Sequence, residues 1–507
     1  MKTTLLLLLT ALCMSGYTQS SDPVFDAYAD IGNPKVKGSV SYEQASQTYT
    51  IKGGGYNIWF NRDEFQFAHK KIDGDFILTA NVELIGAGTD PHRKIGWMIR
   101  GTLEEDAAHA SAVLHGDGLT VLQWRTMRGA YMRDPEDEIF APKRNYTILQ
   151  LERKGKTIIM RGAHPGEPLQ VIGKTENVVL PNEVFAGLFV CSHNADVMEQ
   201  GRAWNVRIDK PVPDSYNPNR EGWIGCRMEI MNVFDGKRKV IRESKGRFEA
   251  PNWMPDGKRL LFNENGSLYT IPVEGGEPTK INTGVANRNN NDHGISFDGK
   301  MLAISHHRDG LPGGGSTVYV LPVTGGEPKM VTDKTPSYWH GWNPNGKEVV
   351  YVAQRDGKSY NIYKKNINGG DEIQVTNFQG SHVDGPEYSP DGKWIYYNGN
   401  QSGTMQLWRM KPDGSGREQL TFDECNNWFP HISPDGKWIA YISFPPDIPV
   451  DDHPSYKRVT LRLMPVSGGA PRVIAYLYGG QGTINVPSWS PDSKHIAFVS
   501  NSQKFKD

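Results

Sequence analysis

The sequence predicts an all-β protein in which an antiparallel β-sandwich precedes a six-bladed β-propeller. Three observations support this prediction. Glycine contributes 55 of 507 residues and aromatic residues contribute 10%, which is typical of short strands joined by tight turns. Apolar and polar residues alternate along several segments of the first 210 residues. A turn motif related to Pro-Asp-Gly-Lys then recurs along the rest of the chain, as expected for stacked β units.

The overall charge excludes one class of partner. Lys and Arg total 56 and Asp and Glu total 57, so the formal net charge is −1. Nucleic-acid binders carry a basic excess or a basic patch, so we expect no nucleic-acid partner. Hydrophobic residues make up 37% and charged residues 22% of the chain, which is typical of a folded protein.

Residues 1–20 have the pattern of a secretory signal peptide. Lys2 precedes a run of five leucines, Leu5 to Leu9, and this apolar run is too short to span a bilayer. The sequence therefore predicts a periplasmic or secreted protein, with cleavage between Gly16 and Ser21 and no transmembrane segment. A lipoprotein anchored through Cys13 is the less favoured alternative, because Leu12 stands where a small residue is expected.

Three cysteines remain after removal of the predicted leader. Cys191, Cys226 and Cys425 are far apart, and none of them belongs to a Cys-x-x-Cys motif. This spacing indicates neither a zinc ribbon nor a disulfide framework. We expect three buried thiols, although export would permit one disulfide.

Residues 22–210 are predicted to form the sandwich. Period-2 alternation places the apolar residues of three segments on one strand face each. These residues are Phe76, Leu78, Ala80, Val82 and Leu84; Ile95, Trp97 and Ile99; and Trp204, Val206 and Ile208. Glycine-rich turns separate the segments, as in a two-sheet antiparallel sandwich.

The stretch from Asp63 to Arg100 carries the motifs Asp-Glu-Phe-Gln-Phe, Asp-Gly-Asp-Phe and Asp-Pro-His-Arg-Lys-Ile-Gly-Trp. It resembles the concanavalin-A-like jelly rolls of secreted bacterial proteins, many of which belong to carbohydrate-related proteins. This resemblance implies a jelly-roll fold and a role connected with glycans.

A proline-rich linker is predicted at residues 211–222. Pro211, Pro213 and Pro218 occur within it together with several turn-forming residues, so we expect neither a strand nor a helix there. The linker divides the chain into residues 22–210 and residues 223–507.

The second part is an internal repeat. Its turn residues are Asp256, Asp298, Asn345, Asp391, Asp435 and Asp492, at spacings of 42, 47, 46, 44 and 57. Repeats of about 40–50 residues with several short strands indicate propeller blades. The last repeat has room for only two strands, and residues 227–241 read as the two that are missing. We therefore expect the two ends of this region to complete one blade and close the ring.

The repeats carry a family signature. Their Trp-Ser-Pro-Asp-Gly-Lys type turns and the segment Gln406–Thr421 resemble the PD40, WD40-like repeats of TolB-type propellers over residues 223–501. The resemblance implies a six-bladed ring and a location in the cell envelope. TolB itself has a different N-terminal domain, so a Pal-like partner is not implied.

Eight residues upstream of the turns are candidates for a ligand site. Inner strands of a propeller surround one axis, so polar groups at similar heights converge on the central channel. The candidates are Asp292, His293, Trp339, His340, Asp384, Glu387, Trp428 and His431. Histidines with a carboxylate could hold a divalent metal, Zn or Mn. His431 is offset by one position from His293 and His340, so it reaches the same face only if its strand is bulged.

Three functions remain open at this point. The favoured prediction is an envelope protein that binds a glycan or a protein partner. The second is a carbohydrate-active enzyme, a polysaccharide lyase or hydrolase, using Asp292, His293, His340, Glu387 and His431. Oligogalacturonate lyases resemble this chain at the level of the fold only. The third is a non-catalytic assembly scaffold, in which these side chains bind loops of a packed propeller.

Overall fold

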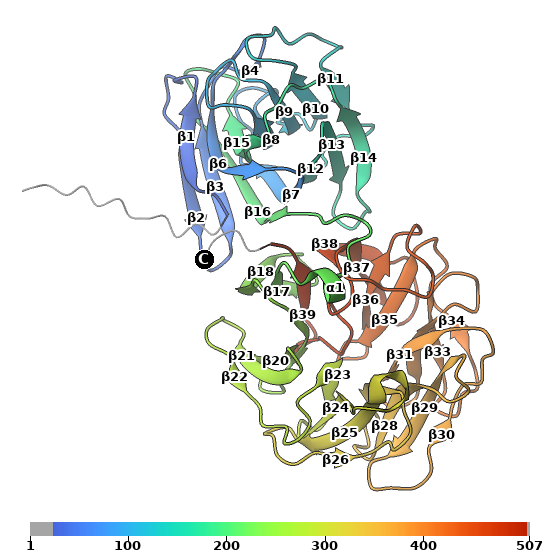
Figure 1. Cartoon of the computed structure of the whole chain (residues 1–507). Helices are drawn as coiled ribbons and strands as arrows, with labels where there is room; N and C mark the ends of the chain where they lie inside the picture. The colour runs from blue at the N-terminus through green and yellow to red at the C-terminus, as the bar shows by residue number, and fades with distance from the viewer. Residues whose placement is uncertain (1–23, 504–507) are drawn as a thin grey trace, which may run out of the picture.

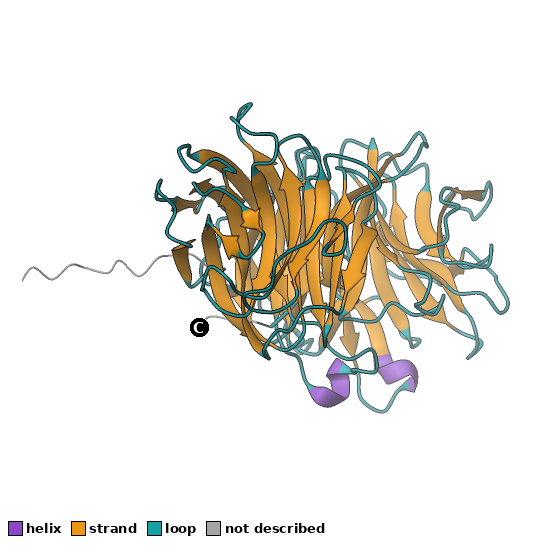
Figure 2. Cartoon of the chain, turned by 90° about the horizontal axis from the view of Figure 1, so that it is seen from above, coloured by secondary structure: helices purple, strands orange, loops and turns teal. Residues whose placement is uncertain are grey.

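Strands form nearly all the regular structure of residues 24–503, the part of the chain that the computed structural model describes. The helical elements are the short α1 (Pro218–Glu221) and the 3-10 turn η1 (Pro312–Gly315), which lie at the edge of the molecule in Figure 2. The predicted signal peptide, including Cys13, falls outside the described residues. No helix among the residues described is long and apolar enough to cross a bilayer.

Two seven-stranded antiparallel sheets form the N-terminal part. The first has the order β1-β6-β15-β8-β9-β10-β11 and the second has the order β14-β13-β12-β7-β16-β3-β2. The first contains β1 (Ala27–Ile31), β6 (Phe65–Asp73), β8 (Lys94–Arg100), β9 (His109–His115), β10 (Thr120–Arg125), β11 (Glu138–Phe140) and β15 (Glu183–Cys191). The second contains β2 (Ser39–Glu43), β3 (Thr48–Gly53), β7 (Phe76–Leu84), β12 (Ile148–Lys154), β13 (Thr157–Ala163), β14 (Gln170–Thr175) and β16 (Glu199–Asp209). A small hairpin joins β4 (Ile58–Trp59) to β5 (Arg62–Asp63).

The two sheets enclose one apolar core, as the alternation predicts. Phe76, Leu78, Ala80 and Val82 of β7 pack there together with Ile95, Trp97 and Ile99 of β8. Burying these side chains removes apolar surface from water at about 25 cal/mol per Å², which makes this core the main stabilising contribution of the N-terminal part.

The expectation for Trp204 is wrong. Its strand β16 is bulged between Trp204 and Arg207, so Ala203, Val206 and Ile208 enter the core while Trp204 stays half-buried outside it. The residue inside the bulge contacts the propeller. Asn205 adopts a φ of 54°, and its side-chain amide donates to the carbonyl oxygen of Gly236 at 2.8 Å.

Six sheets form the propeller, which is the lower, green-to-red part of Figure 1. Its strands are β17 (Cys226–Asn232), β18 (Arg238–Ser244), β19 (Phe248–Trp253), β20 (Arg259–Glu264), β21 (Ser267–Pro272), β22 (Thr279–Lys280), β23 (Asn289–Ile295), β24 (Met301–His307), β25 (Ser316–Pro322), β26 (Lys329–Met330), β27 (Ser337–Trp342), β28 (Glu348–Gln354), β29 (Tyr360–Asn366), β30 (Ile373–Gln374), β31 (Val383–Tyr388), β32 (Ile395–Gly399), β33 (Gln406–Met410), β34 (Glu418–Gln419), β35 (Asn426–Ile432), β36 (Trp438–Phe444), β37 (Lys457–Pro465), β38 (Arg472–Gly479) and β39 (His495–Asn501). Five sheets have four strands each, and the sixth combines β18, β17 and β39.

The sixth blade closes the ring in the predicted way. Strand β39, near the C-terminus, pairs antiparallel with β17 over seven residues, from Cys226 opposite Asn501 to Asn232 opposite His495. A bridge between Trp489 and Ile496 adds the inner edge of this blade. Joining the two ends of the region in one sheet satisfies backbone groups that an open edge would leave exposed.

The linker and the two domains form a continuous interface. The linker contains one helical turn, α1, although no helix is expected there from the sequence. Pro218 is compatible with this turn because it occupies the first helical position, where a missing N–H costs nothing. Across the interface, Glu229 of β17 accepts from Arg207 of β16 at 2.7 Å, and within the propeller it accepts from Arg238 of β18 at 2.8 Å. These groups are buried, so the domains are held together by a desolvated ionic contact.

The three cysteines within residues 24–503 are free thiols. Cys191 and Cys226 are buried as expected, whereas Cys425 is only half-buried. The Cys425 sulfur accepts from the Arg462 guanidinium at 3.2 Å, and this polar contact explains its place outside the apolar core.

Candidate functional site

The inner strands of the propeller are bulged near their beginnings. The pairing register shifts after Glu249 in β19, Asp384 in β31 and Trp428 in β35. The residue that follows each of them has a positive φ, between 55° and 58°. A bulge redirects the side chains before and after it. The side chains at the beginnings of the inner strands therefore do not follow the alternation between two faces that a regular strand shows.

Asp384 lies at the centre of a cluster of imidazoles. Its Oδ1 atom lies 2.9 Å from Nε2 of His340 on the neighbouring blade. Its Oδ2 atom lies 4.0 Å from Nε2 of His382 and 4.0 Å from Nε2 of His453. One carboxylate thus faces three imidazoles from three different elements, and one of its oxygens has no close hydrogen-bond donor among them.

Asp384 and His340 shift each other's pKa through their direct contact. Burial opposes ionisation, yet the adjacent His340 holds the pKa of Asp384 well below its usual range. Burial likewise opposes protonation of His340, but Asp384 raises the pKa of that imidazole above its usual value. Asp384 and His340 therefore form an ion pair at neutral pH.

Asp292 has the opposite environment. Burial raises its pKa to about 7, and the nearby charges of Asp384 and Glu249 add to this effect, although His340 partly offsets it. Glu249 is also buried, which raises its pKa, and it is paired with Arg247. The channel thus contains one ionised carboxylate and one carboxyl group that titrates near neutrality.

Aromatic rings surround the imidazoles. The ring of His382 stacks on Tyr360 at a centroid distance of 5.3 Å, and the ring of His453 lies 4.4 Å from Trp428 and 5.3 Å from Phe429. Such packing restricts the rotamers of the imidazoles and excludes water from one side of each ring. The cluster is therefore preorganised.

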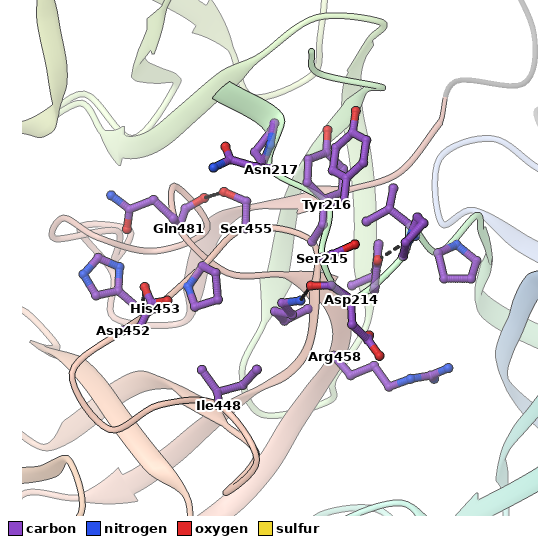
Figure 3. A pocket seen from close by; sticks show the side chains of 18 of the residues that line it. Asp214, Ser215, Tyr216, Asn217, Ile448, Asp452, His453, Ser455, Arg458 and Gln481 are labelled. Carbon is purple, nitrogen blue, oxygen red and sulfur yellow. Dashed lines mark hydrogen bonds between the residues drawn. The ribbon is translucent and has the colours of Figure 1, made fainter. Parts of the chain in front are cut away.

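A cavity of about 1200 Å³ opens beside this cluster at the junction of the two domains. Its walls come from the sandwich (Asp75, Glu152 and Lys154), from the linker between Pro211 and Asn219, and from the propeller loop 445–456. Figure 3 shows His453, Ser455 and Gln481 on one side of the space and Tyr216 and Asn217 on another. His453 belongs both to the cavity wall and to the Asp384 cluster, so it connects the two.

Two predicted site residues lie between blades. His293 is fully buried, and this burial lowers its pKa to about 3. Trp339 is also buried, and its ring lies directly over Gly294 of the preceding blade, where an added Cβ would come within 2.1 Å of it. These two side chains pack the ring of blades and do not join the Asp384 cluster.

Two further candidates form a separate pair. His431 Nδ1 lies 2.7 Å from Glu387 Oε2, and His431 Nε2 lies 2.7 Å from the carbonyl oxygen of Ile484. From the sequence, His431 is expected to share a strand face with His293 and His340 only if its strand is bulged, and the strand is bulged. Of the eight candidates, the structure thus brings Asp292, His340, Asp384 and Trp428 to the cluster.

Sequence reasoning missed His453, Tyr360, Arg247 and Glu249. One signal could have located His453. The last two turn residues are 57 positions apart, whereas the other spacings are 42–47. The additional residues form the loop between β36 and β37, which contains His453. An unusually long repeat indicates a loop added on one face, and such loops often build binding sites.

The structure gives no geometric support for the expected Zn or Mn site. Among residues 24–503, no group of three or more His, Cys, Asp and Glu side chains has an arrangement that could hold a metal ion.

Comparison with known proteins agrees with this architecture. The PD40 family, described as the TolB beta propeller domain, matches residues 334–447. The protein Atu1656 of Agrobacterium fabrum is 45% identical over 279 residues, which cover 55% of this chain and 93% of Atu1656. This chain belongs to the same family as Atu1656. The match to PD40 supports a TolB-like type for the propeller of this chain.

Two further relatives place this family near TolB. A solved structure from Agrobacterium tumefaciens, provisionally named TolB, has 43% identity and a TM-score of 0.52 and covers 56% of this chain and 99% of that one. The Tol-Pal system protein TolB of Francisella tularensis is 24% identical over 282 residues, and the alignment covers 52% of this chain and 59% of that protein.

Proposed function

We propose that this protein is exported to the cell envelope, where it binds a glycan in the cavity between its two domains. The TolB-like propeller supports the envelope location. The predicted signal peptide supports it as well, because it implies a periplasmic or secreted protein. The resemblance of residues 22–210 to concanavalin-A-like jelly rolls supports a glycan over a protein as the ligand.

The observation that carries this proposal is the continuity of the cavity with the Asp384 cluster through His453. Glycan sites combine aromatic faces, against which the C–H groups of a sugar pack, with a few polar groups that pair with hydroxyls. The cavity offers both kinds of group. Tyr216, Trp223 and Tyr456 line it together with Asn217 and Gln481.

A carbohydrate-active enzyme, a lyase or hydrolase, is the second candidate function. The observation that favours it is the contrast between Asp384, whose pKa lies below its usual range because His340 outweighs the effect of burial, and Asp292, whose pKa burial raises to about 7. Paired carboxyl groups with opposite protonation are a common arrangement of general acid and base. Incubation of glycans with the full chain and measurement of new reducing or unsaturated ends separates this function from binding alone.

The primary test is a glycan array probed with the full chain, followed by calorimetric titration of the glycans that bind. Asp384→Asn and Gln481→Ala are expected to weaken binding about tenfold or more, while His307→Ala, which lies outside the cavity, leaves it unchanged. A blank array together with capture of one envelope protein would overturn the glycan proposal in favour of a protein partner or an assembly scaffold.

A further inference from the structure

Carboxyl groups gather at the floor of the propeller channel. Glu249 of β19, Asp292 of β23 and Asp384 of β31 come from three different blades. They interact electrostatically, since Asp384 and Glu249 both contribute to the raised pKa of Asp292, behind the larger effect of burial. When all three acids are ionised, their three negative charges exceed the two positive charges of Arg247 and His340.

The cations near this floor compensate the negative charge of the three carboxylates only in part. Arg247 is paired with Glu249, and His340 is paired with Oδ1 of Asp384. Within the described chain, no Lys or Arg forms an ion pair with Asp292 or Asp384; their neighbours are the histidines 340, 382 and 453. The Oδ2 atom of Asp384 has the nearest imidazole nitrogens 4.0 Å away, and the Asp384 side chain keeps 15% of its exposure.

We propose that the channel floor binds the ammonium group of an amino sugar, an inference that rests on the glycan-binding function proposed above. An ammonium group carries three N–H donors. Oδ2 of Asp384 accepts one of them, and the imidazoles of His382 and His453 accept the others through Nε2. The aromatic rings packed against both imidazoles keep water away, which strengthens the attraction between ammonium and carboxylate.

An anionic sugar does not fit the same floor. A uronate, sulfate or phosphate group would approach the carboxylates of Asp384 and Asp292, neither of which has a Lys or Arg partner among the described residues, and like charges repel. An N-acetylated sugar lacks the positive charge and gains only neutral hydrogen bonds, which are about half as strong as charge-assisted ones. The arrangement thus distinguishes a free amine from its acetylated form.

The inference has a consequence for protons. Asp292 is close to half-protonated at neutral pH, because burial raises its pKa to about 7. A bound cation favours its ionised form, so ligand binding releases protons. The other titratable groups facing the floor are the histidines 340, 382 and 453, the tyrosines 338 and 360, the acids Glu387 and Asp452, and the Arg247–Glu249 pair.

The test compares two probes on the full chain: the β-1,4-linked tetramer of glucosamine and the same tetramer of N-acetylglucosamine. At pH 7 and low salt, calorimetry is expected to show at least tenfold tighter binding of the glucosamine tetramer. Repeating the titration in buffers of different ionisation enthalpy is expected to show proton release. Asp384→Asn removes the preference, whereas Asp451→Asn, which changes an exposed carboxylate that does not line the cavity, keeps it.

The outcomes separate this inference from the proposed function. Equal affinity for the two tetramers overturns the ammonium site, while binding of either one still supports a glycan-binding protein. A blank result for both probes and for the glycan array overturns both proposals. Equal loss of preference in Asp451→Asn and Asp384→Asn indicates unspecific charge attraction and overturns the site. If Asp384→Asn unfolds, Asp292→Asn replaces it, with loss of proton release as the expected result.

Discussion

His431 and Glu387 are joined by a 2.7 Å contact between Nδ1 and Oε2 inside the ring of blades. The second imidazole nitrogen bonds to the carbonyl oxygen of Ile484 at 2.7 Å, and the second carboxylate oxygen accepts from the backbone N–H of Ile432 at 3.1 Å. All four polar atoms therefore have partners within the protein. The pair connects three consecutive blades, and its contacts favour a structural role.

Replacing His431 with alanine is expected to destabilise the propeller. Glu387 would remain as a buried charge without its partner, which typically costs about 3 kcal/mol. Chemical denaturation measures this loss in the free energy of unfolding. His307→Ala, which removes a half-exposed imidazole, should cost less than about 0.5 kcal/mol. A stable His431→Ala variant that no longer binds glycan would instead place His431 in the ligand site.

Gly294→Ala is expected to disturb the contact between two blades. An added Cβ would lie 2.1 Å from the Trp339 ring, and the ring is held in the interior, so either the ring or the strand must shift. Overpacking of this kind costs about 1–3 kcal/mol. The matched control is Gly246→Ala, whose Cβ would meet its nearest neighbour at 3.6 Å. Equal melting temperatures for the two variants would contradict this account of Trp339.

The ionic contact between the domains should make stability depend on acid pH. Although burial opposes ionisation, Arg207 and Arg238 lower the pKa of Glu229 far below its ordinary value of 4.5. A group with a depressed pKa in the folded state contributes stability above its unfolded pKa and loses that contribution as the pH falls. The free energy of unfolding should therefore decline below about pH 4.5. Glu229→Gln should flatten this decline, and the exposed substitution Glu277→Gln should not.

The ion pair in the channel can be observed directly. Burial opposes protonation of His340, but Asp384 raises its pKa above the ordinary 6.5, so the stabilisation from this pair is present below pH 6.5 and fades as the pH rises. Imidazole NMR should show His340 titrating above this value, and Asp384→Asn should move its titration below it. An unchanged titration in Asp384→Asn would show that the two groups do not interact.

Much of the fold could be predicted because it depends on local patterns. Alternation placed Phe76, Leu78 and Trp97 in the sandwich core, since strand geometry has a period of two residues. The site could be predicted less well. Bulges in the inner strands break this period, and they decide that Asp384 joins the imidazole cluster while His293 is buried elsewhere.

The sequence alone determined the β architecture, the six repeats and the completion of the last blade by residues 227–241, because repeated turn motifs and apolar alternation act over short distances. Only the tertiary structure decided which polar residues meet. His453 reaches Asp384 from a loop 69 residues further along the chain, and the cavity beside them needs walls from both domains and the linker. Contacts between segments far apart in sequence depend on the three-dimensional path of the backbone, and this path cannot be derived from local sequence patterns.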